Sequence, residues 1–180
     1  AINRLQRAIT QYPPSDVRYI PTVDEEIQQV KDVTIDQVRA IYNEFLGADH
    51  GELAIVGDFD ENESLSVLKQ TFEGWKSPQP FARIERPYQA GLKPVHEQID
   101  TPDKANACYY SGLTVEMKDS DPDYPALLMG NYVLGGGARS SRIADRLRQK
   151  GGYSYSAASQ LSASPLDAKG GLIVMAIYNP

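Results

Sequence analysis

The chain has 180 residues, with 41% hydrophobic residues, 23% charged residues and a formal net charge of -6. An acidic chain is poorly suited to nucleic acid, because that binding depends on cationic side chains that neutralise phosphates. Its apolar runs fall well short of the roughly 20 residues that span a bilayer, and no stretch has the pattern of a signal peptide. We therefore expect a globular protein with a real core and with no nucleic-acid or membrane partner.

Two short helices are expected near the N-terminus. Apolar residues at helical spacing indicate a helix in residues 1–11, and the YPPSD run at 12–16 ends it. Residues 24–32 have the pattern of a short polar helix or turn.

Residues 34–46 carry the clearest helix signal in this part of the chain. Thr34 and Gln37 have the spacing of a capping box, in which each side chain bonds the backbone N–H of the other residue. Gly47 is expected to supply a left-handed exit. One apolar face is made by Ile35, Val38, Ile41, Tyr42 and Phe45.

A strand, a turn and a further helix are expected next. Leu53 to Val56 form a short apolar strand, Asp60 and Glu63 open a helix, and Gly74 ends it. Leu65, Leu68 and Phe72 are expected to point inward. The unit lacks the glycine patterns GxGxxG and GxxxxGK[ST], which argues against a nucleotide site.

Residues 77–92 contain Pro78, Pro80 and Pro87 and are expected to be an extended connection. The connection either separates two domains or crosses the surface of one. We favour a single domain over residues 1–180, because each side alone is small for a core. The chain begins inside a helical pattern and stops after a strand pattern, so we expect it to be an excised piece of a longer protein.

The sequence of the second half of the chain predicts two strands, then two helices, then two more strands. This order indicates an α+β fold, with an antiparallel or mixed sheet and helices packed on one face. Cys108, the only cysteine, is expected to be a buried small hydrophobe. The predicted strands are 94–100, 105–116, 153–163 and 169–178, and the helices start at 121–123 and at Arg139 and end at Leu134 and Lys150.

The candidate site lies in the segment LGGGARSSRIADRLRQKGGYSYS at 134–156. Arg148 and Tyr155 are seven residues apart across a helix-to-strand turn, away from the surface row formed by Arg139, Arg142 and Arg146. Tyr153 and Tyr155 should share one face of the strand. A guanidinium and a phenol that converge would hold a carbonyl oxygen and stabilise charge that develops on it. The alternative is structural, with solvated arginines and packed tyrosines.

The same segment resembles "LGG…SSRL…LREK.GLSY" of the pitrilysin-like zinc peptidases, family M16, in their C-terminal half that binds no zinc. VTIDQVRAIYNEFLGADHGELAIVGDFD and FEGWKSPQPFARIERPY also resemble that family, and together the matches cover most of residues 12–178. The resemblance implies that Arg148 and Tyr155 contact the substrate backbone near the scissile carbonyl. Two positions depart from the family pattern: Gln149 replaces a common acidic residue, and Tyr153 a common leucine.

The inverted His-x-x-Glu-His motif that holds zinc in the family's other half is absent. His50 precedes Gly51, and His96-Glu97 has no second histidine nearby, so both are expected to be surface residues. We expect no cofactor in this chain, and zinc in the full-length protein or partner half.

Two functions remain open at this point. The chain is either the inactive, substrate-holding half of a zinc endopeptidase or a non-enzymatic scaffold homologue of that family. The first reading implies a catalytic half-domain in the same chain or in a partner subunit, and a peptide or unfolded protein as substrate. The resemblance favours the periplasm, with the cytoplasm as the alternative.

Overall fold

A computed structural model of the protein describes residues 1–179, which form two compact units. One unit combines residues 1–25 with the residues from 85 onward, and the other comprises residues 26–84. The boundary between Ile84 and Glu85 lies within the predicted connection 77–92, which contains no helix or strand.

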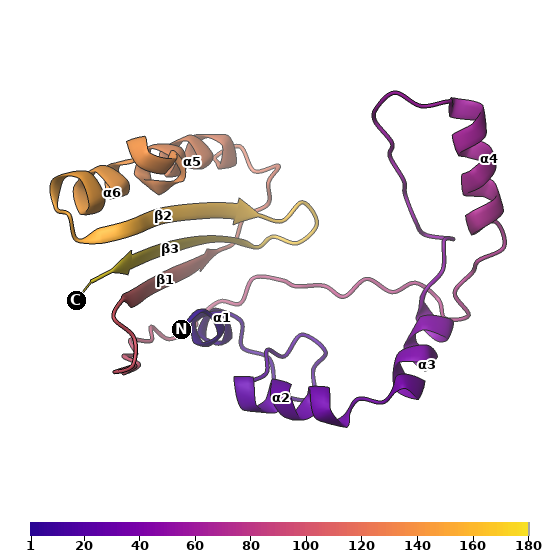
Figure 1. Cartoon of the computed structure of the whole chain (residues 1–180), viewed down its shortest axis with the longest axis horizontal. Coiled ribbons are helices and arrows are strands. Elements are labelled where there is room, and N and C mark those ends of the chain that lie inside the picture. Colours follow the sequence, from indigo (N-terminus) through magenta and orange to yellow (C-terminus); the bar gives the residue numbers. More distant parts are fainter. Residues whose placement is uncertain (180) are drawn as a thin grey trace. The chain divides into compact units, whose positions relative to one another are not determined.

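The first unit is built on a three-stranded antiparallel sheet of order β1-β3-β2. Strands β1 (Ala107–Val115) and β2 (Ser154–Ala163) both pair with the central β3 (Gly170–Tyr178). β3 is rich in β-branched and aromatic residues, which suit a central strand. The α+β class with an antiparallel sheet is confirmed (Figure 1).

The segment between β1 and β2 forms a helical layer over one face of the sheet (Figure 1). It contains α5 (Tyr124–Asn131), the π-helix η1 (Tyr132–Gly136), and α6 (Arg142–Ala144). Small residues line this interface, since the buried apolar side chains are Ala144, Ala157 and Ala176. Small side chains let the helical layer approach the sheet closely, and this close packing fixes the position from which the chain turns into β2.

Helix α1 (Ile2–Ile9) packs against the opposite face of the sheet. The register pairs Gly112 with Ile173. Because alternate strand residues point to opposite faces, Gly112 is on the face of the sheet away from the helical layer. A Cβ at Gly112 would lie 3.4 Å from both methyl groups of Leu5. Gly112 therefore leaves room for the leucine of α1.

The second unit contains α3 (Ile35–Phe45) and α4 (Glu61–Phe72), while α2 (Val23–Asp32) crosses the boundary between the units. The capping box is confirmed: the Thr34 oxygen accepts the Gln37 N–H at 3.3 Å, and the Gln37 side chain accepts the Thr34 N–H at 2.8 Å. Asp60 caps α4 by accepting the Glu63 N–H at 2.8 Å.

The prediction that Gly47 supplies a left-handed exit from α3 is wrong. Gly47 is absent from the glycines with positive φ, and the residue after α3, Leu46, is already extended. A Cβ at Gly47 would instead lie 2.8 Å from the carbonyl carbon of Lys76 and still closer to the N–H of Ser77. This glycine is needed for the close approach of two backbone segments, whereas Gly74 does adopt the left-handed conformation at φ +82°.

Two predicted strands do not form. Leu53–Val56 and residues 94–100 are outside every helix and strand in the described residues 1–179. A strand exists only when a second strand satisfies its backbone groups, and the local pattern does not say whether one is available. Val56 is 97% exposed, which shows how far this apolar run is from a covered position.

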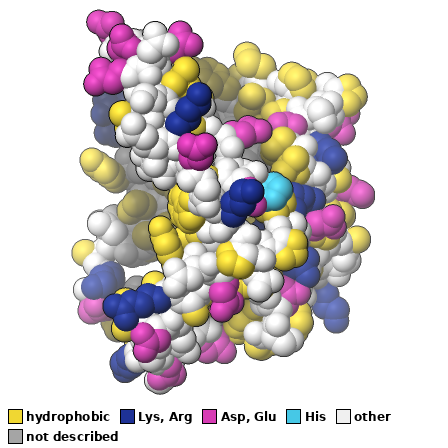
Figure 2. Space-filling model, turned by 90° about the vertical axis from the view of Figure 1, so that its right-hand side faces the viewer, with side chains coloured by type: hydrophobic (Ala, Val, Ile, Leu, Met, Phe, Trp, Pro, Cys, Tyr) yellow, Lys and Arg dark blue, Asp and Glu magenta, His cyan; other side chains and the backbone are white. Residues whose placement is uncertain are grey.

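Several side chains that were expected to be inside lie at the surface. Cys108 is exposed, because it sits on the edge strand β1 rather than in the covered centre of the sheet. The apolar face of α3 is at least half exposed, and Leu65 is 46% exposed. Figure 2 shows hydrophobic side chains scattered among charged ones on the face that it presents. Among the described residues, no helix is long and apolar enough to cross a membrane.

Candidate functional site

Arg148 lies on a helical segment that begins three residues later than its pattern predicts. The residues before it form a short 3-10 turn, η2 (Ala138–Ser140), and α6 then starts after Ser141. The buried Ser141 hydroxyl donates to the carbonyl of Ala138 at 2.8 Å and accepts the Ala144 N–H at 3.4 Å. A serine in this role ends the preceding turn and caps the new helix.

The helix that carries Arg148 widens as it ends. Its last part, η3 (Asp145–Lys150), is a π-helix, and the Gly151 N–H donates to the carbonyl of Arg146 at 3.1 Å, five residues back. A π-helix is rare and is found disproportionately at functional sites. The wider winding changes the direction in which Arg148 leaves the helix relative to an α-helix.

The two glycines after η3 serve different purposes. Gly152 has φ +65°, a conformation that favours glycine. Gly151 is covered by the ring of Tyr153, whose Cε2 atom lies 2.5 Å from where a Cβ would be. Tyr153 precedes β2, so it packs back over the turn instead of sharing a strand face with Tyr155 as predicted.

Tyr155 is the extra residue of a β-bulge. Ser154 pairs with Tyr178 and Ser156 with Ile177, which are neighbours on β3, so Tyr155 has no partner on that strand. The buried Ser154 hydroxyl lies 2.8 Å from the carbonyl oxygen of Ser156 and 2.7 Å from that of Ile177. Bulges re-aim side chains and are common beside active sites. Here the bulge leaves Tyr155 77% exposed.

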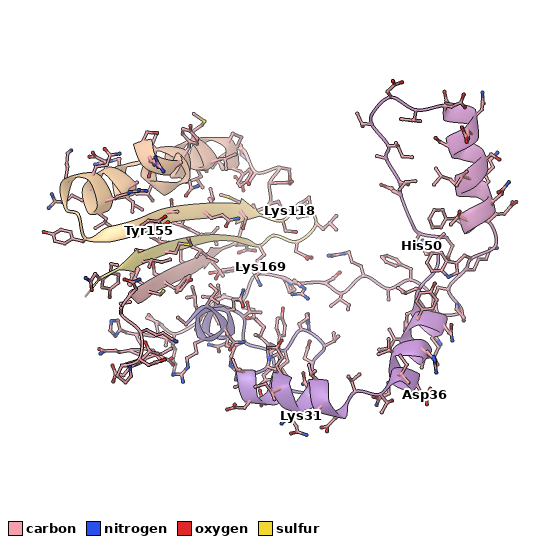
Figure 3. All side chains as sticks on the ribbon, viewed as in Figure 1. Lys31, Asp36, His50, Lys118, Tyr155 and Lys169 are labelled. Carbon is pink, nitrogen blue, oxygen red and sulfur yellow. The ribbon has the colours of Figure 1, made fainter. Side chains whose placement is uncertain are left out.

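The structure brings Arg148 and Tyr155 together. The Arg148 Cζ atom lies 5.4 Å from the centre of the Tyr155 ring, in a cation–π contact. Arg148 is half-buried, and Figure 3 shows Tyr155 projecting at the start of β2, away from the body of the sheet. Within residues 1–179, neither side chain has a hydrogen bond or an ion pair, so their donors are free for a ligand.

Neighbouring side chains hold the site without entering it. Gln149 donates from Nε2 to the carbonyl of Arg139 at 2.7 Å, so it ties η3 to the preceding turn. Lys150 pairs with Asp145 across η3 at 2.7 Å. The row formed by Arg139, Arg142 and Arg146 is exposed to solvent, as its spacing predicts.

The residues present do not fit a metal ion. The Nε2 atom of His50 lies 3.8 Å from a carboxylate oxygen of Asp49, and the His50 ring is 5.1 Å from the ring of Phe81. Of these three side chains, only His50 and Asp49 could be metal ligands. His96 is exposed. Across residues 1–179, no three His, Cys, Asp or Glu side chains gather in a way that could hold a metal.

Ser154 is the residue that sequence analysis missed. Its hydroxyl bridges the bulge that exposes Tyr155, and it is only 5% exposed itself. The YSYS pattern at 153–156 gives no signal for it, because a bulge depends on how β2 pairs with β3 and not on a local motif.

Comparison with known proteins gives one family and several relatives. The family model described as the peptidase M16 inactive domain matches residues 32–178. The probable inactive metalloprotease YmfF of Bacillus subtilis (strain 168) is 29% identical over 157 residues, which is 87% of this chain and 35% of that protein.

Two solved structures have the same fold. The crystal structure of a peptidase M16 inactive domain from Pseudomonas fluorescens superposes with a TM-score of 0.78 at 22% identity, over 99% of this chain and 41% of that one. The crystal structure of a protease from Helicobacter pylori gives a TM-score of 0.61 at 20% identity, over 86% of this chain and 37% of that one. The chain thus spans between 35% and 41% of the length of these proteins.

Proposed function

The chain belongs to the family of the peptidase M16 inactive domain, and from this premise we propose that it is the substrate-holding half of a zinc metallopeptidase. Arg148 and Tyr155 would hold the backbone carbonyl of an extended peptide while a second half-domain cleaves it. That catalytic half would belong to the same polypeptide or to a partner subunit. The substrate would be a peptide or an unfolded protein.

The observation that carries this proposal is the Arg148–Tyr155 pair, in which the phenol is exposed and neither side chain has a hydrogen bond within residues 1–179. Its cation–π contact is worth about 0.5–1 kcal/mol at an exposed site. A hydrogen bond from a charged donor contributes about 1.5–3 kcal/mol. A hydrogen bond to a peptide carbonyl therefore contributes more free energy than the part of the cation–π contact that it displaces. The charged guanidinium and neutral phenol would also stabilise negative charge on that oxygen if its carbon were attacked.

The same chemistry limits what the pair can do. An arginine keeps its proton at all relevant pH values, so it is no general base. A neutral phenol is a poor nucleophile. Because the chain's residues also do not fit zinc, the bond-breaking chemistry would belong to the zinc centre of the other half.

A non-enzymatic scaffold is the second candidate. It is favoured by the relative whose name describes it as a probable inactive metalloprotease. In such a scaffold, Arg148 and Tyr155 would serve only to pack. The 77% exposure of Tyr155 argues against packing within this chain.

The test uses the full-length protein that contains this chain and a quenched fluorescent peptide. Tyr155→Phe should lower kcat by roughly 100- to 1000-fold, the loss typical of a missing oxyanion donor. Arg148→Lys should lower kcat/KM by at least about tenfold, because a point charge does not reproduce the planar fork.

Two matched controls separate the site from its surroundings. Tyr153→Phe and Arg146→Lys change the same residue types at neighbouring exposed positions, and both should leave the rate within about twofold. Equal rates for Tyr155→Phe and the wild type would refute the holding role. A full-length protein with no chelator-sensitive cleavage at all would favour the scaffold.

A further inference from the structure

A cavity of about 450 Å³ lies on the α1 side of the sheet, at the end of β2 away from Tyr155. Gln160, the lining residue of β2 nearest to Tyr155, is five residues away from it, so the cavity begins roughly 17 Å from Tyr155 along the strand. Figure 3 shows Tyr155 and Lys169, which lines the cavity, towards opposite ends of the sheet. The two sites therefore do not share residues.

Three segments of the first unit enclose the cavity. The sheet supplies its floor, Ile9 at the end of α1 closes one side, and Arg86 from the extended segment after residue 84 closes another. That segment is held at both ends: Gln11 and Gln89 exchange two hydrogen bonds of 2.9 Å, and the Arg86 N–H donates to Asp167 at 3.0 Å. The walls of the cavity are thus fixed by hydrogen bonds.

The lining combines two cations and one carboxylate, that of Asp167, with a mostly apolar surface. Arg86 and Lys169 both face the cavity, although the chain as a whole carries a net charge of -6. Burial lowers the pKa of Lys169, the nearby charge of Arg86 lowers it further, and Asp167 opposes this by a smaller amount. With Arg86 and Lys169 opposed by one carboxylate, cationic side chains outnumber anionic ones in the lining. Hydroxyl and amide groups for further hydrogen bonds come from Thr114, Gln160 and Ser162.

We propose that this cavity binds a carboxylate carried on a short apolar stem. The carboxylate would pair with Arg86 and Lys169, and the stem would lie against Ile9 and Ile173. Two sources share this chemistry: the C-terminal carboxylate of a peptide that ends in an apolar residue, and an acidic side chain within a peptide. The site is independent of the role proposed for Arg148 and Tyr155.

An apolar floor favours a carboxylate over a bare inorganic anion. Inorganic phosphate would satisfy the two cations but would leave Ile9 and Ile173 in contact with a hydrated ion. A carboxylate with an alkyl stem satisfies the cations and also removes apolar surface from water, at about 25 cal/mol per Å². A planar guanidinium also matches the geometry of a carboxylate in two parallel hydrogen bonds.

The experiment is an NMR titration of this chain, with the backbone amide signals of Gly170 and Gly171, which line the cavity and are present in every variant, as the reporters. The probes are acetyl-Ala-Ala-Leu with a free C-terminus, the same peptide amidated, acetyl-Ala-Glu-Ala amide, and inorganic phosphate. The free-acid peptide should bind at least tenfold more tightly than its amide. Tight binding of the glutamate peptide would assign the site to acidic side chains, whereas weak binding would assign it to a C-terminus.

Variants then tie the binding to the cavity. Lys169→Met and Arg86→Gln should each weaken binding of the free-acid peptide by at least tenfold, and Arg86 is exposed, so its replacement leaves the fold intact. The matched control Lys104→Met removes an exposed lysine outside the cavity and should change nothing. Tyr155→Phe should also leave this binding unchanged. Equal binding of acid and amide, preference for phosphate, or insensitivity to both variants would overturn the proposal.

Discussion

At the residue scale, Arg148 and Tyr155 meet because the backbone is irregular at both positions. Arg148 lies in the π-helix η3, and Tyr155 is the extra residue of a bulge that the Ser154 hydroxyl bridges. A regular strand would place Tyr155 in alternation with its neighbours and would pair it with β3. The bulge frees it from that pattern and leaves it exposed beside the guanidinium.

Asp16 supplies a residue-scale prediction about pH. Its carboxylate accepts three hydrogen bonds from Arg18, at 2.8, 2.8 and 2.7 Å, and these bonds lower its pKa to about 2 from an ordinary 3.8. A depressed pKa means that the interaction is fully present above about pH 3.8 and is lost as the pH falls through about 2. Arg18 also donates to the Glu85 carbonyl at 2.9 Å, so protonation of Asp16 should loosen that contact as well.

The measurement is a carbon-13 NMR titration of the Asp16 carboxyl. A midpoint near 2 is expected, with recovery to about 3.8 in Arg18→Met. Arg39→Met, which removes an exposed arginine far along the chain, should leave the midpoint in place. An ordinary midpoint in the wild type would show that Arg18 does not hold the carboxylate in solution.

At the element scale, the glycine-rich turn after α5 sets how closely the helical layer approaches β2. A Cβ at Gly135 would lie 2.8 Å from the Cβ of Ser159 and closer still to its backbone N–H. The Ser159 hydroxyl in turn donates to Asn131 Oδ1 at 2.7 Å. Ala138 follows with φ +52°, a conformation that non-glycine residues rarely adopt. This turn therefore places α6 and η3, and with them Arg148, against the sheet.

Gly135→Ala tests this role. The added methyl group must displace the backbone of β2, so we expect a loss of about 1–3 kcal/mol in the free energy of unfolding. Gly130→Ala is the matched control, since Gly130 lies in the last turn of α5 and a Cβ there meets nothing within 4 Å. It should be neutral or stabilising by up to about 1 kcal/mol. Urea denaturation of both variants would measure the difference, and equal stabilities would refute the close-packing argument.

At the scale of the whole molecule, the two units differ in how well they cover their apolar side chains. The first unit has a sheet with helices on both faces. The second unit, residues 26–84, has no strand, and the apolar face of α3 is at least half exposed. Its aromatic contacts join α3 and α4 to the segment after α4, because Trp75 stacks with Tyr42 and with Phe72 at centre-to-centre distances of 6.0 and 6.1 Å.

This exposure predicts that the isolated chain binds a hydrophobic dye such as ANS at neutral pH. The signal should fall in the double variant Ile41→Glu with Phe45→Glu, which charges the exposed face of α3. Asp36→Asn on the same helix is the control and should leave the dye signal unchanged. Fluorescence of the dye, read beside a far-ultraviolet spectrum that shows an intact fold, is the measurement. A wild-type chain that binds no dye would show that this face is covered in solution.

Local signals in the sequence predicted most of the helices, although the helix expected from Arg139 starts only at Arg142. The choice of Arg148 and Tyr155 as site residues also drew on the family resemblance and stays a prediction. Each helix cap involves residues three apart in the sequence, so it can be predicted from the sequence. These caps are the capping box of Thr34 and Gln37 and the cap at Asp60. The strands β2 and β3 were also found close to their predicted bounds, because their alternation and their turn are near each other in the chain. The α+β class followed from the order of these elements.

Tertiary structure alone decided the features that depend on a distant partner. Residues 53–56 and 94–100 have strand composition, but a strand needs another strand, and none of the described residues pairs with them. Cys108 has an apolar neighbourhood in sequence but lies on an edge strand. The bulge at Tyr155 arises from pairing between β2 and β3. Backbone hydrogen bonds within a helix join residues that are close in the sequence, so the helices could be predicted. Strand pairing, sheet edges and bulges depend on contacts between distant segments, so they could not be predicted.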